Sequence, residues 1–527
     1  MTTGYLLDLL GLRIQPVALG CAAGAAAVAG YRGFRHAPGS PGWQELAGFG
    51  AVVIGLGVFL LWRAWPALLP VTDGPDVVHH LQLIHLIQRT HRLAHDPALG
   101  VYLLEMMNYT PGSHILAATI AAWLRVDALR VVHPIAALCV ALKGGVLYLI
   151  ARRVIEGPHG PVQALAAPLL ALTPAVYFFG SFSRFFFFAQ VVSETFAIAM
   201  LLAVVSWAET RERRYLWWFG VLGVGAFLAW PVWIGPPVLT LLVTMAVVTG
   251  RWRVRVQEAM LALGPIAMVA AVHVALHAGG AAIVGSSGAV TRPSVSAFGV
   301  SFLVLAGGGT LLAVRQTSVR PVAAFLAATL LQAAVLGALD QWAGSTSFYM
   351  PFKMMYLAIL PGAVLGAAFL ARVSAAVVGR SAVRGIAIVA PLIVAVLLAV
   401  GRVPLRRPHS PIAPSALEAG LWARDHTPPA CVDYFSRHWL TGYWLHLDVL
   451  GNPRLTDRMR AESFEFHDSV SKWIQGRGLP YAIVEDFEAV PRDARVDMIP
   501  LRRFGPAAVV QNTRPGSDPE SALCRGK

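Results

Sequence analysis

Long apolar runs are the feature that most restricts how this chain can fold. Runs of about 17–25 apolar residues can cross a bilayer as helices, whose backbone polar groups pair within the segment. The sequence predicts twelve such spans, centred near residues 21, 56, 140, 171, 198, 222, 242, 268, 305, 331, 361 and 392. The first run also fits a signal peptide, which would leave eleven. With 56% hydrophobic and 13% charged residues among 527, a soluble enzyme of this length is excluded.

Arginines in the connections between these runs predict which side each connection faces. Six successive arginine-bearing connections fall on one side, with Arg32 and Arg35; Arg152 and Arg153; Arg211, Arg213 and Arg214; Arg251, Arg253 and Arg255; Arg315 and Arg320; and Arg372, Arg380 and Arg384. Short loops rich in arginine and lysine stay in the cytoplasm, so both termini, the 71–128 loop and the tail are predicted to lie outside. We therefore expect a multi-pass protein of the cytoplasmic (inner) membrane, surrounded by lipid. Its net charge of +14 then needs no nucleic-acid partner.

The composition changes near residue 402, where a proline-rich linker begins. We expect residues 1–401, with the exterior loop 71–128, to form the membrane bundle and residues 402–527 to form an exterior, periplasmic soluble domain. In the tail, SALEAGLWARDHTP has the pattern of a helix and YAIVEDFEAV that of a strand. The predicted fold class is mainly α, a polytopic helical bundle with a small C-terminal α/β domain. Cys431 and Cys524 both fall in the tail, where a disulfide and two free thiols are equally compatible with the sequence.

The exterior loop concentrates titratable side chains, with three aspartates and five histidines in residues 71–96. Its periodicity predicts a helix from Asp76 to about residue 93, with Asp73 placed to cap its start and a proline at its first position. Asp76, His79 and His80 then share one helix face. For Asp73 and Asp76, capping and dipole roles compete with roles as a general base or cation ligand.

A second helix is predicted in NYTPGSHILAATIAAWLRV, residues 108–126. Its apolar part has about 13 residues, fewer than a span requires, so we expect it to lie at the membrane interface or to re-enter it.

Four features occur in order along the chain: DGPDVVHH in the first exterior loop, NYTPGSH at the start of a short helix, many spans and an exterior tail. In this order they resemble the integral membrane glycosyltransferases of the GT-C superfamily. The likeness in layout covers about residues 45–400, and Thr110 replaces the second proline of the YPPGxH-type segment. The resemblance implies a polyprenyl-phosphate-linked sugar as donor and an envelope glycan, lipid or protein as acceptor. It also implies inverting displacement on the exterior face, with Asp73 or, as second choice, Asp76 as the base.

Further site residues follow from the same two motifs. We expect Tyr109, His79, His80 and His114 to bind substrate, and Asp73, Asp76, His79 and His114 to converge on an exterior-facing cavity. A divalent cation held by Asp76, His79 or His80 remains open. Zinc at His91 and His95, four apart on a helix, is a weaker alternative to two solvated histidines.

A leaving lipid phosphate calls for cations at the exterior ends of spans. Arg184 in GSFSRFFFFAQ, Lys353 in FYMPFKMMY and Arg402 after the last span are the candidates, and snorkelling toward phospholipid is the competing interpretation. Glu194 falls inside a span, where a carboxylate is costly and usually functional, so we expect it to face the sugar or to pair with Arg184. Lys143 has a similar position and is expected to pair with an acid or a carbonyl.

Two other functions compete with a transferase. A transporter would show repeated halves with matching helix breaks, whereas WPVWIGPP at residues 230–237 has no counterpart in the other half. A non-catalytic envelope polysaccharide assembly protein would use its tail for binding. The aromatic residues within 433–448 fit such a sugar-binding surface, although the core of the tail domain is the favoured interpretation.

Overall fold

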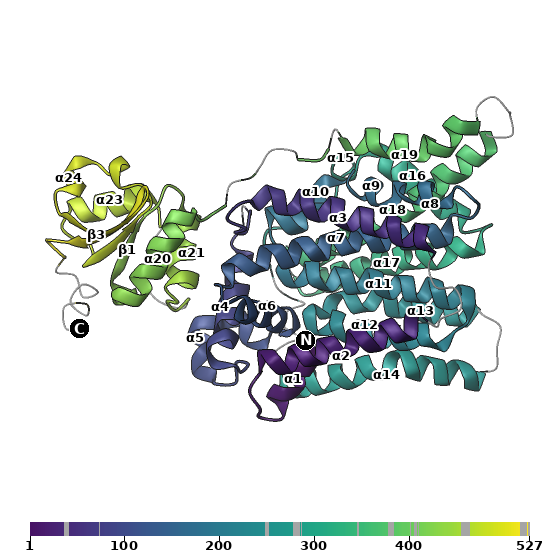
Figure 1. Ribbon diagram of the computed structural model, residues 1–527, viewed down its shortest axis with the longest axis horizontal. Helices are drawn as coiled ribbons and strands as arrows, with labels where there is room; N and C mark the ends of the chain where they lie inside the picture. Colours follow the sequence, from purple (N-terminus) through teal and green to yellow (C-terminus); the bar gives the residue numbers. More distant parts are fainter. Residues whose placement is uncertain are drawn as a thin grey trace.

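A computed structural model describes residues 1–35, 42–72, 74–247, 252–277, 285, 287–344, 347–377, 384–400, 402–404, 408, 410–454, 464–516 and 524. A bundle of long, roughly parallel or antiparallel helices forms the larger part, and a small unit of helices and strands lies beyond one of its ends (Figure 1). Asp73 lies outside the described residues, so its expected capping and catalytic positions remain predictions.

Eleven of the expected span centres fall inside helices of the bundle. These helices are α2 (Pro16–Arg35), α3 (Trp43–Ala64), α7 (Leu129–Val154), α11 (Phe188–Thr210), α12 (Arg213–Ala229), α13 (Gly235–Val247), α14 (Trp252–Leu276), α16 (Val300–Leu312), α17 (Arg320–Trp342), α18 (Tyr349–Val377) and α19 (Arg384–Val400). Six of them, α3, α7, α11, α14, α17 and α18, are long and apolar enough to cross a membrane. Most of α7, α11 and α18 is buried, so these three form the centre of the bundle.

The span expected near residue 171 is not one continuous helix. The chain there forms α8 (Gly160–Ala164), α9 (Ala166–Ala171), α10 (Ala175–Phe178) and a π-helical turn at Gly180–Arg184. Pro174 stands between α9 and α10, where a proline cannot donate a hydrogen bond to continue the helix. This break carries the chain toward the start of α11.

The exterior loop contains both of the predicted helices. They are α4 (Asp76–Thr90) and α6 (Gly112–Leu124), and between them lie the short turns η1 (Pro97–Leu99), α5 (Gly100–Leu103) and η2 (Leu104–Asn108). Pro75 precedes α4 as its cap rather than forming its first residue. A Cβ atom on Gly112 would lie 2.8 Å from the main-chain carbon of Leu228, so the glycine of NYTPGSH permits the close approach of α6 to α12.

The C-terminal domain, which we define by the elements from α20 to β4, is an α/β unit as expected. It comprises α20 (Pro414–His426), η8 (Pro429–Cys431), β1 (Val432–Phe435), α21 (Trp439–Trp444), η9 (Leu445–Val449), α23 (Phe466–Ile474), β2 (Tyr481–Val484), η10 (Phe487–Ala489), α24 (Arg492–Arg495), β3 (Met498–Phe504) and β4 (Ala507–Asn512). The strands form one sheet in the order β1-β2-β4-β3, in which only β1 and β2 are parallel. Cys431 and Cys524 form a disulfide. Tyr434 and Trp444 are fully buried, which confirms a core role for part of the aromatic segment.

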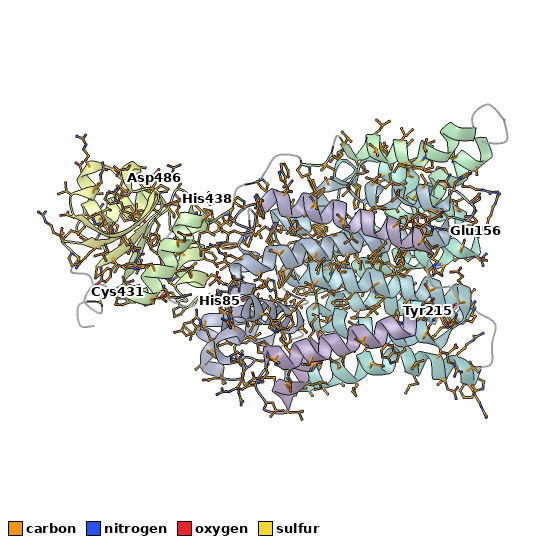
Figure 2. All side chains as sticks on the ribbon, in the orientation of Figure 1. His85, Glu156, Tyr215, Cys431, His438 and Asp486 are labelled. Carbon is orange, nitrogen blue, oxygen red and sulfur yellow. A yellow bond between two sulfur atoms is a disulfide. The ribbon has the colours of Figure 1, made fainter. Side chains whose placement is uncertain are left out.

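The C-terminal domain lies at the end of the bundle that carries α4, α5 and α6 (Figure 1). Glu156 and Tyr215 lie at the opposite end of the bundle (Figure 2). Glu156 lies just after Arg152 and Arg153, and Tyr215 directly follows Arg214. The linker contacts the bundle where Ser410 donates a hydrogen bond to the carbonyl of Pro70 at 2.9 Å. This arrangement separates two arginine-bearing connections from the domain by the length of the bundle, as the predicted topology requires.

Candidate functional site

The start of α4 brings together the acid and the histidines of the two sequence motifs. Asp76 and His80 are one helical turn apart, and Asp76 Oδ2 lies 3.3 Å from His80 Nε2. The other nitrogen of that ring, Nδ1, lies 2.9 Å from Nε2 of His114 on α6. Asp76 keeps 34% of its side chain exposed, whereas His114 is fully buried. A carboxylate that is open to a ligand is thus linked through His80 to a buried imidazole.

Asp76 and His114, at the two ends of this series of contacts, differ in protonation state. Burial opposes the ionisation of Asp76, but a hydrogen bond from His80 and the charges of His80, Lys353 and His79 lower its pKa below the ordinary value. Burial and the charge of His80 lower the pKa of His114 well below that of a free imidazole. Asp76 is therefore a carboxylate at neutral pH and His114 is neutral. His80 presents one ring nitrogen to each of these two partners.

Tyr109 forms one wall of the same cluster. Its ring meets His80 and His114 edge to face, with centroids 5.2 and 5.7 Å away, and lies 5.3 Å from the ring of Trp230. Burial, followed by the negative charge of Asp76, raises the pKa of Tyr109 well above its usual value. The phenol therefore stays protonated and can donate a hydrogen bond.

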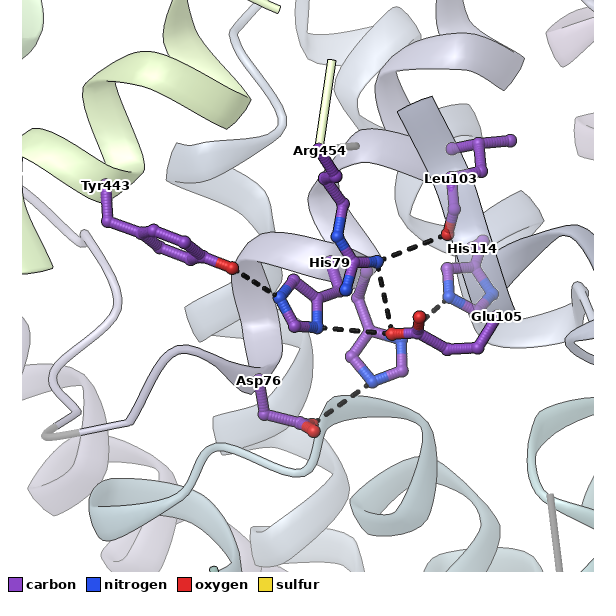
Figure 3. A network of polar contacts seen from close by, with 8 residues as sticks. Asp76, His79, Leu103, Glu105, His114, Tyr443 and Arg454 are labelled. Carbon is purple, nitrogen blue, oxygen red and sulfur yellow. Dashed lines mark hydrogen bonds and ion pairs between the residues drawn. The ribbon is translucent and has the colours of Figure 1, made fainter. Parts of the chain in front are cut away.

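His79 lies beside this cluster but turns toward the C-terminal domain. Its Nε2 is 2.9 Å from the hydroxyl of Tyr443, and its Nδ1 is 3.4 Å from Glu105 Oε1 (Figure 3). The same carboxylate oxygen accepts a hydrogen bond from Arg454 at 3.1 Å. Burial opposes its charge, but His79 and Arg454 lower the pKa of Glu105 to about 2. The C-terminal domain and the segment that follows its η9 turn thus complete the site.

Sequence reasoning assigned no role in this site to Glu105, Tyr443 or Arg454. Tyr443 lies 364 positions from its partner His79, and Arg454 lies 349 positions from Glu105. A spacing pattern signals only neighbours within a few turns, so nothing in the local sequence marks these three residues.

Lys353 lies in the first turns of α18, and its charge helps to lower the pKa of Asp76. Lys353 as a whole residue is 4% exposed. Its ammonium lies over three aromatic rings, 3.9 Å from the centroid of Phe187, 4.4 Å from that of Tyr349 and 5.0 Å from that of Trp230. Aromatic faces stabilise a cation without neutralising its charge. Lys353 therefore offers a positive charge beside the carboxylate.

Arg184 and Arg402 hold different positions. The main-chain carbonyl of Arg184 accepts a hydrogen bond from Thr72 at 2.9 Å, so its backbone adjoins the segment that leads into α4. Its guanidinium is exposed and lies 5.2 Å from the ring of Phe185. Arg402 is exposed and contacts the carbonyl of Ser296 at 3.5 Å, on a different segment.

Glu194 is held within the bundle by a partner other than the expected Arg184. Its Oε2 lies 2.5 Å from the ammonium of Lys143, and its Oε1 accepts a hydrogen bond from Gln190 at 3.0 Å. All three side chains are almost completely buried. Lys143 thus pairs with an acid, as its position in a span predicted, and the pair removes the cost of an isolated buried charge.

The histidines considered as metal ligands do not converge. His79 is directed to Glu105 and Tyr443 rather than to the side shared by Asp76 and His80. His95 lies 2.7 Å from Asp8 of the N-terminal helix α1 (Thr2–Leu9). Within the described part of the chain, no three histidine, cysteine or acidic side chains are grouped to hold a metal. The divalent cation expected at Asp76, His79 or His80 therefore remains a hypothesis.

The membrane bundle, the two loop helices and the appended α/β unit share their fold with solved structures of membrane glycosyltransferases. These include the following three. Oligosaccharyltransferase AglB from Archaeoglobus fulgidus, in complex with an inhibitory peptide and a dolichol-phosphate, matches with a TM-score of 0.52 and 14% identity over 84% of this chain and 69% of that one. The apo oligosaccharyltransferase of the same organism gives 0.50 and 13%, over 84% and 70%. Arabinofuranosyltransferase AftD from Mycobacteria gives 0.53 and 16%, over 90% of this chain and 42% of that one.

No family model matches the sequence, and no curated protein matches it. At identities this low the structural similarity establishes a shared fold. The resemblance to the GT-C superfamily is therefore confirmed at the level of the fold.

Proposed function

We propose that this protein is a glycosyltransferase that moves a sugar from a polyprenyl-phosphate carrier to a hydroxyl group of an envelope glycan, lipid or protein. One observation carries the proposal: within this fold, Asp76 is close enough to the buried ammonium of Lys353 for that charge to lower its pKa, and it is linked through His80 to the buried His114. A base and a cation are the two groups that displacement of a lipid phosphate requires.

In the proposed reaction the acceptor oxygen attacks the anomeric carbon from the face opposite the phosphate. The bond from that carbon to the phosphate oxygen breaks, and its electron pair leaves with the lipid phosphate. The acceptor proton passes to a carboxylate, either Asp73 or Asp76. Attack from the opposite face inverts the configuration of the anomeric carbon.

Lys353 is proposed to stabilise the negative charge that develops on the departing phosphate. Arg184 adjoins the segment before α4 and is proposed to contact the phosphate from the exposed side, with Arg402 as a more distant donor. AglB binds a dolichol-phosphate, which supports a lipid phosphate as the donor. An oligosaccharyltransferase structure also holds zinc and sulfate, which supports testing a divalent cation.

His79, His80, His114, Tyr109 and Glu194 remain the proposed substrate-binding residues. Tyr109 is suited to donate a hydrogen bond to a sugar, because its phenol remains protonated. Glu194 would act from within its pair with Lys143.

We propose that the protein lies in the cytoplasmic membrane and that its site is on the face opposite the cytoplasm. The disulfide between Cys431 and Cys524 supports this placement of residues 402–527, because disulfides persist mainly in oxidising compartments. A cysteine-specific reagent that cannot cross membranes checks it: after reduction, both thiols should react in intact cells.

Mass spectrometry of the purified protein tests the donor. We expect a co-purifying polyprenyl phosphate, or its sugar-linked form, and transfer of labelled sugar to envelope material when the protein is supplied with that lipid. Absence of both the lipid and the transfer would exclude the proposed activity.

A further inference from the structure

A cavity lies beyond the candidate catalytic cluster, between α4 and the C-terminal domain. It has a volume of about 440 Å³ and is lined by side chains of α4, α5 and η9, among them Gln82, His85, Arg89, Tyr102, Leu447 and Asp448. His85 lies where the domain meets the bundle (Figure 2). Cavities of about 300–1,000 Å³ with apolar walls and a few convergent polar groups are typical of small-molecule sites.

The polar groups of this cavity are buried but incompletely paired. Gln82 is 9% exposed, and its side-chain oxygen has no hydrogen-bond partner among the described residues. Asp448 is 1% exposed, and its Oδ2 likewise has no hydrogen-bond partner there. Buried polar atoms are almost always paired, so two such acceptors in one cavity indicate a ligand that donates hydrogen bonds to them.

Charged groups of both signs line the cavity. His85 lies 2.9 Å from Asp448 and 3.4 Å from Asp127. Burial opposes its charge, but these two carboxylates raise the pKa of His85 to about 10. Burial raises the pKa of Asp448, and the charges of His85 and Arg89 oppose that effect. No single sign of charge dominates the lining, which favours a ligand without a net charge.

The shape of the lining suits a ring that is apolar on one face and polar at its edge. Tyr102, which is 42% exposed, and Leu447 provide apolar surface, while Gln82, Arg89 and Asp448 provide hydrogen-bonding groups. At Gly451 the backbone has a φ of +70°, and a Cβ atom there would lie 3.6 Å from the Arg89 guanidinium. The positive φ favours glycine at this position. Sugar rings combine an apolar C–H face with hydroxyl groups at the edge.

We propose that this cavity binds a neutral sugar residue of the acceptor, next to the residue that receives the transferred sugar. The proposal rests on the glycosyltransferase function and names glycans as the acceptor class. Gln82 and His85 lie three and six residues beyond His79 on α4, which is about 5–9 Å along the helix axis. That separation is comparable to the length of a sugar unit, so one glycan can occupy both places.

Saturation-transfer NMR on the full-length protein in lipid nanodiscs tests the cavity directly. The probes are the methyl glycosides of glucose, mannose, galactose and arabinose, with glucuronate and inorganic phosphate as charged probes. We expect at least one neutral glycoside to bind, and its affinity to fall about fivefold or more in Gln82→Leu, which removes one hydrogen-bonding group. Tyr102→Ala removes the exposed ring and should have a similar effect.

Gln88→Leu is the matched control, because Gln88 lies on the same helix, outside the cavity lining, and bonds only weakly to the Val126 carbonyl at 3.4 Å. It should bind the glycoside like the wild type, and unchanged melting temperatures would show that all three variants fold. Binding of no neutral glycoside, preferential binding of a charged probe, or unchanged binding in both cavity variants would overturn the proposal. Glycoside binding in a protein that neither holds polyprenyl phosphate nor transfers sugar would overturn the transferase function instead, and with it the assignment of the bound sugar as an acceptor.

Discussion

Helix α4 carries two clusters in which a histidine lies beside carboxylates, and they differ in what surrounds the imidazole. Near the start of the helix, His80 lies between one partly exposed carboxylate, Asp76, and the neutral ring of His114. Farther along, His85 lies between the carboxylates of Asp127 and Asp448. The first arrangement leaves the Asp76 carboxylate partly exposed to a ligand, whereas the second raises the pKa of His85 to about 10 between a loop and the C-terminal domain. The neighbours, and not the residue types, separate a chemical role from a structural one.

The comparison is sharpest when the first cluster loses its carboxylate charge. Asp76→Asn should lower turnover by about 10²- to 10⁴-fold if Asp76 is the base, while the melting temperature stays nearly constant. Asp73→Asn should do so if Asp73 is the base, since asparagine caps a helix about as well as aspartate. Turnover is measured with saturating polyprenyl-phosphate sugar, so that weaker donor binding is not mistaken for loss of the base.

Asp73→Ala separates the two roles of that residue. If Asp73 has only a structural role ahead of α4, where Pro75 holds the cap position, the alanine variant should lose at most about 0.5–2 kcal/mol of stability while the asparagine variant remains active. Full activity of both asparagine variants would end the acid–base proposal for this loop.

The second cluster should respond in stability rather than in chemistry. His85→Leu leaves the buried Asp448 and the partly buried Asp127 without their cation, which should cost up to about 3–5 kcal/mol of the free energy that holds the C-terminal domain on α4. Hydrogen exchange in residues 445–452 should therefore accelerate. His95→Leu is a control, because His95 is 55% exposed in its pair with Asp8 and should contribute about 1 kcal/mol or less. Equal exchange in both variants would show that His85 does not hold the domain.

Lys353→Met removes a charge next to the first cluster but keeps a long apolar side chain among the aromatic rings. Donor affinity should fall about 10- to 10²-fold, as expected for loss of a charged hydrogen-bonding partner. Binding of a fluorescent polyprenyl phosphate measures the effect. Arg320→Met, an exposed cation distant in the sequence from the site, should bind the lipid normally. An unchanged affinity in Lys353→Met would return this residue to a purely structural role.

A rise in pH should weaken the stabilisation by the His85 cluster, and this effect should be smaller than those of the substitutions. The pKa of His85 is raised from 6.5 to about 10, so its stabilising contribution is fully present below pH 6.5 and is lost as the pH rises through about 10. The difference in melting temperature between the wild type and His85→Leu should therefore shrink steadily between pH 6.5 and 10. A difference that stays constant over this range would mean that His85 carries no proton in the folded protein.

The local part of this site could be predicted from the sequence. The helical pattern placed Asp76 and His80 on one face, and the paired motifs pointed to His114, because α6 is short and must pack against the bundle. The partners of His79 and His85 could not be predicted, since Tyr443 and Asp448 reach them only when a separately folded domain docks. Docking depends on the shapes of two assembled surfaces, which no spacing along the chain encodes.

The same limit applies inside the membrane. The cost of burying a charge marked both Glu194 and Lys143 as paired residues, but it did not say with which partner. Their contact joins α7 to α11 and depends on how these helices are rotated about their axes. Helix rotation is set by packing along the whole interface, so it cannot be derived from one apolar run.

The disulfide of the C-terminal domain also determines what a protease can do to it. All four strands, together with Tyr443, Asp448 and Arg454, lie between Cys431 and Cys524, so the cross-link encloses them in one covalent ring. A single cut inside the ring opens it without releasing a fragment, and both new ends stay attached to the rest of the chain. Two cuts are needed before any strand can leave. The groups that the domain contributes to α4 thus survive a first nick.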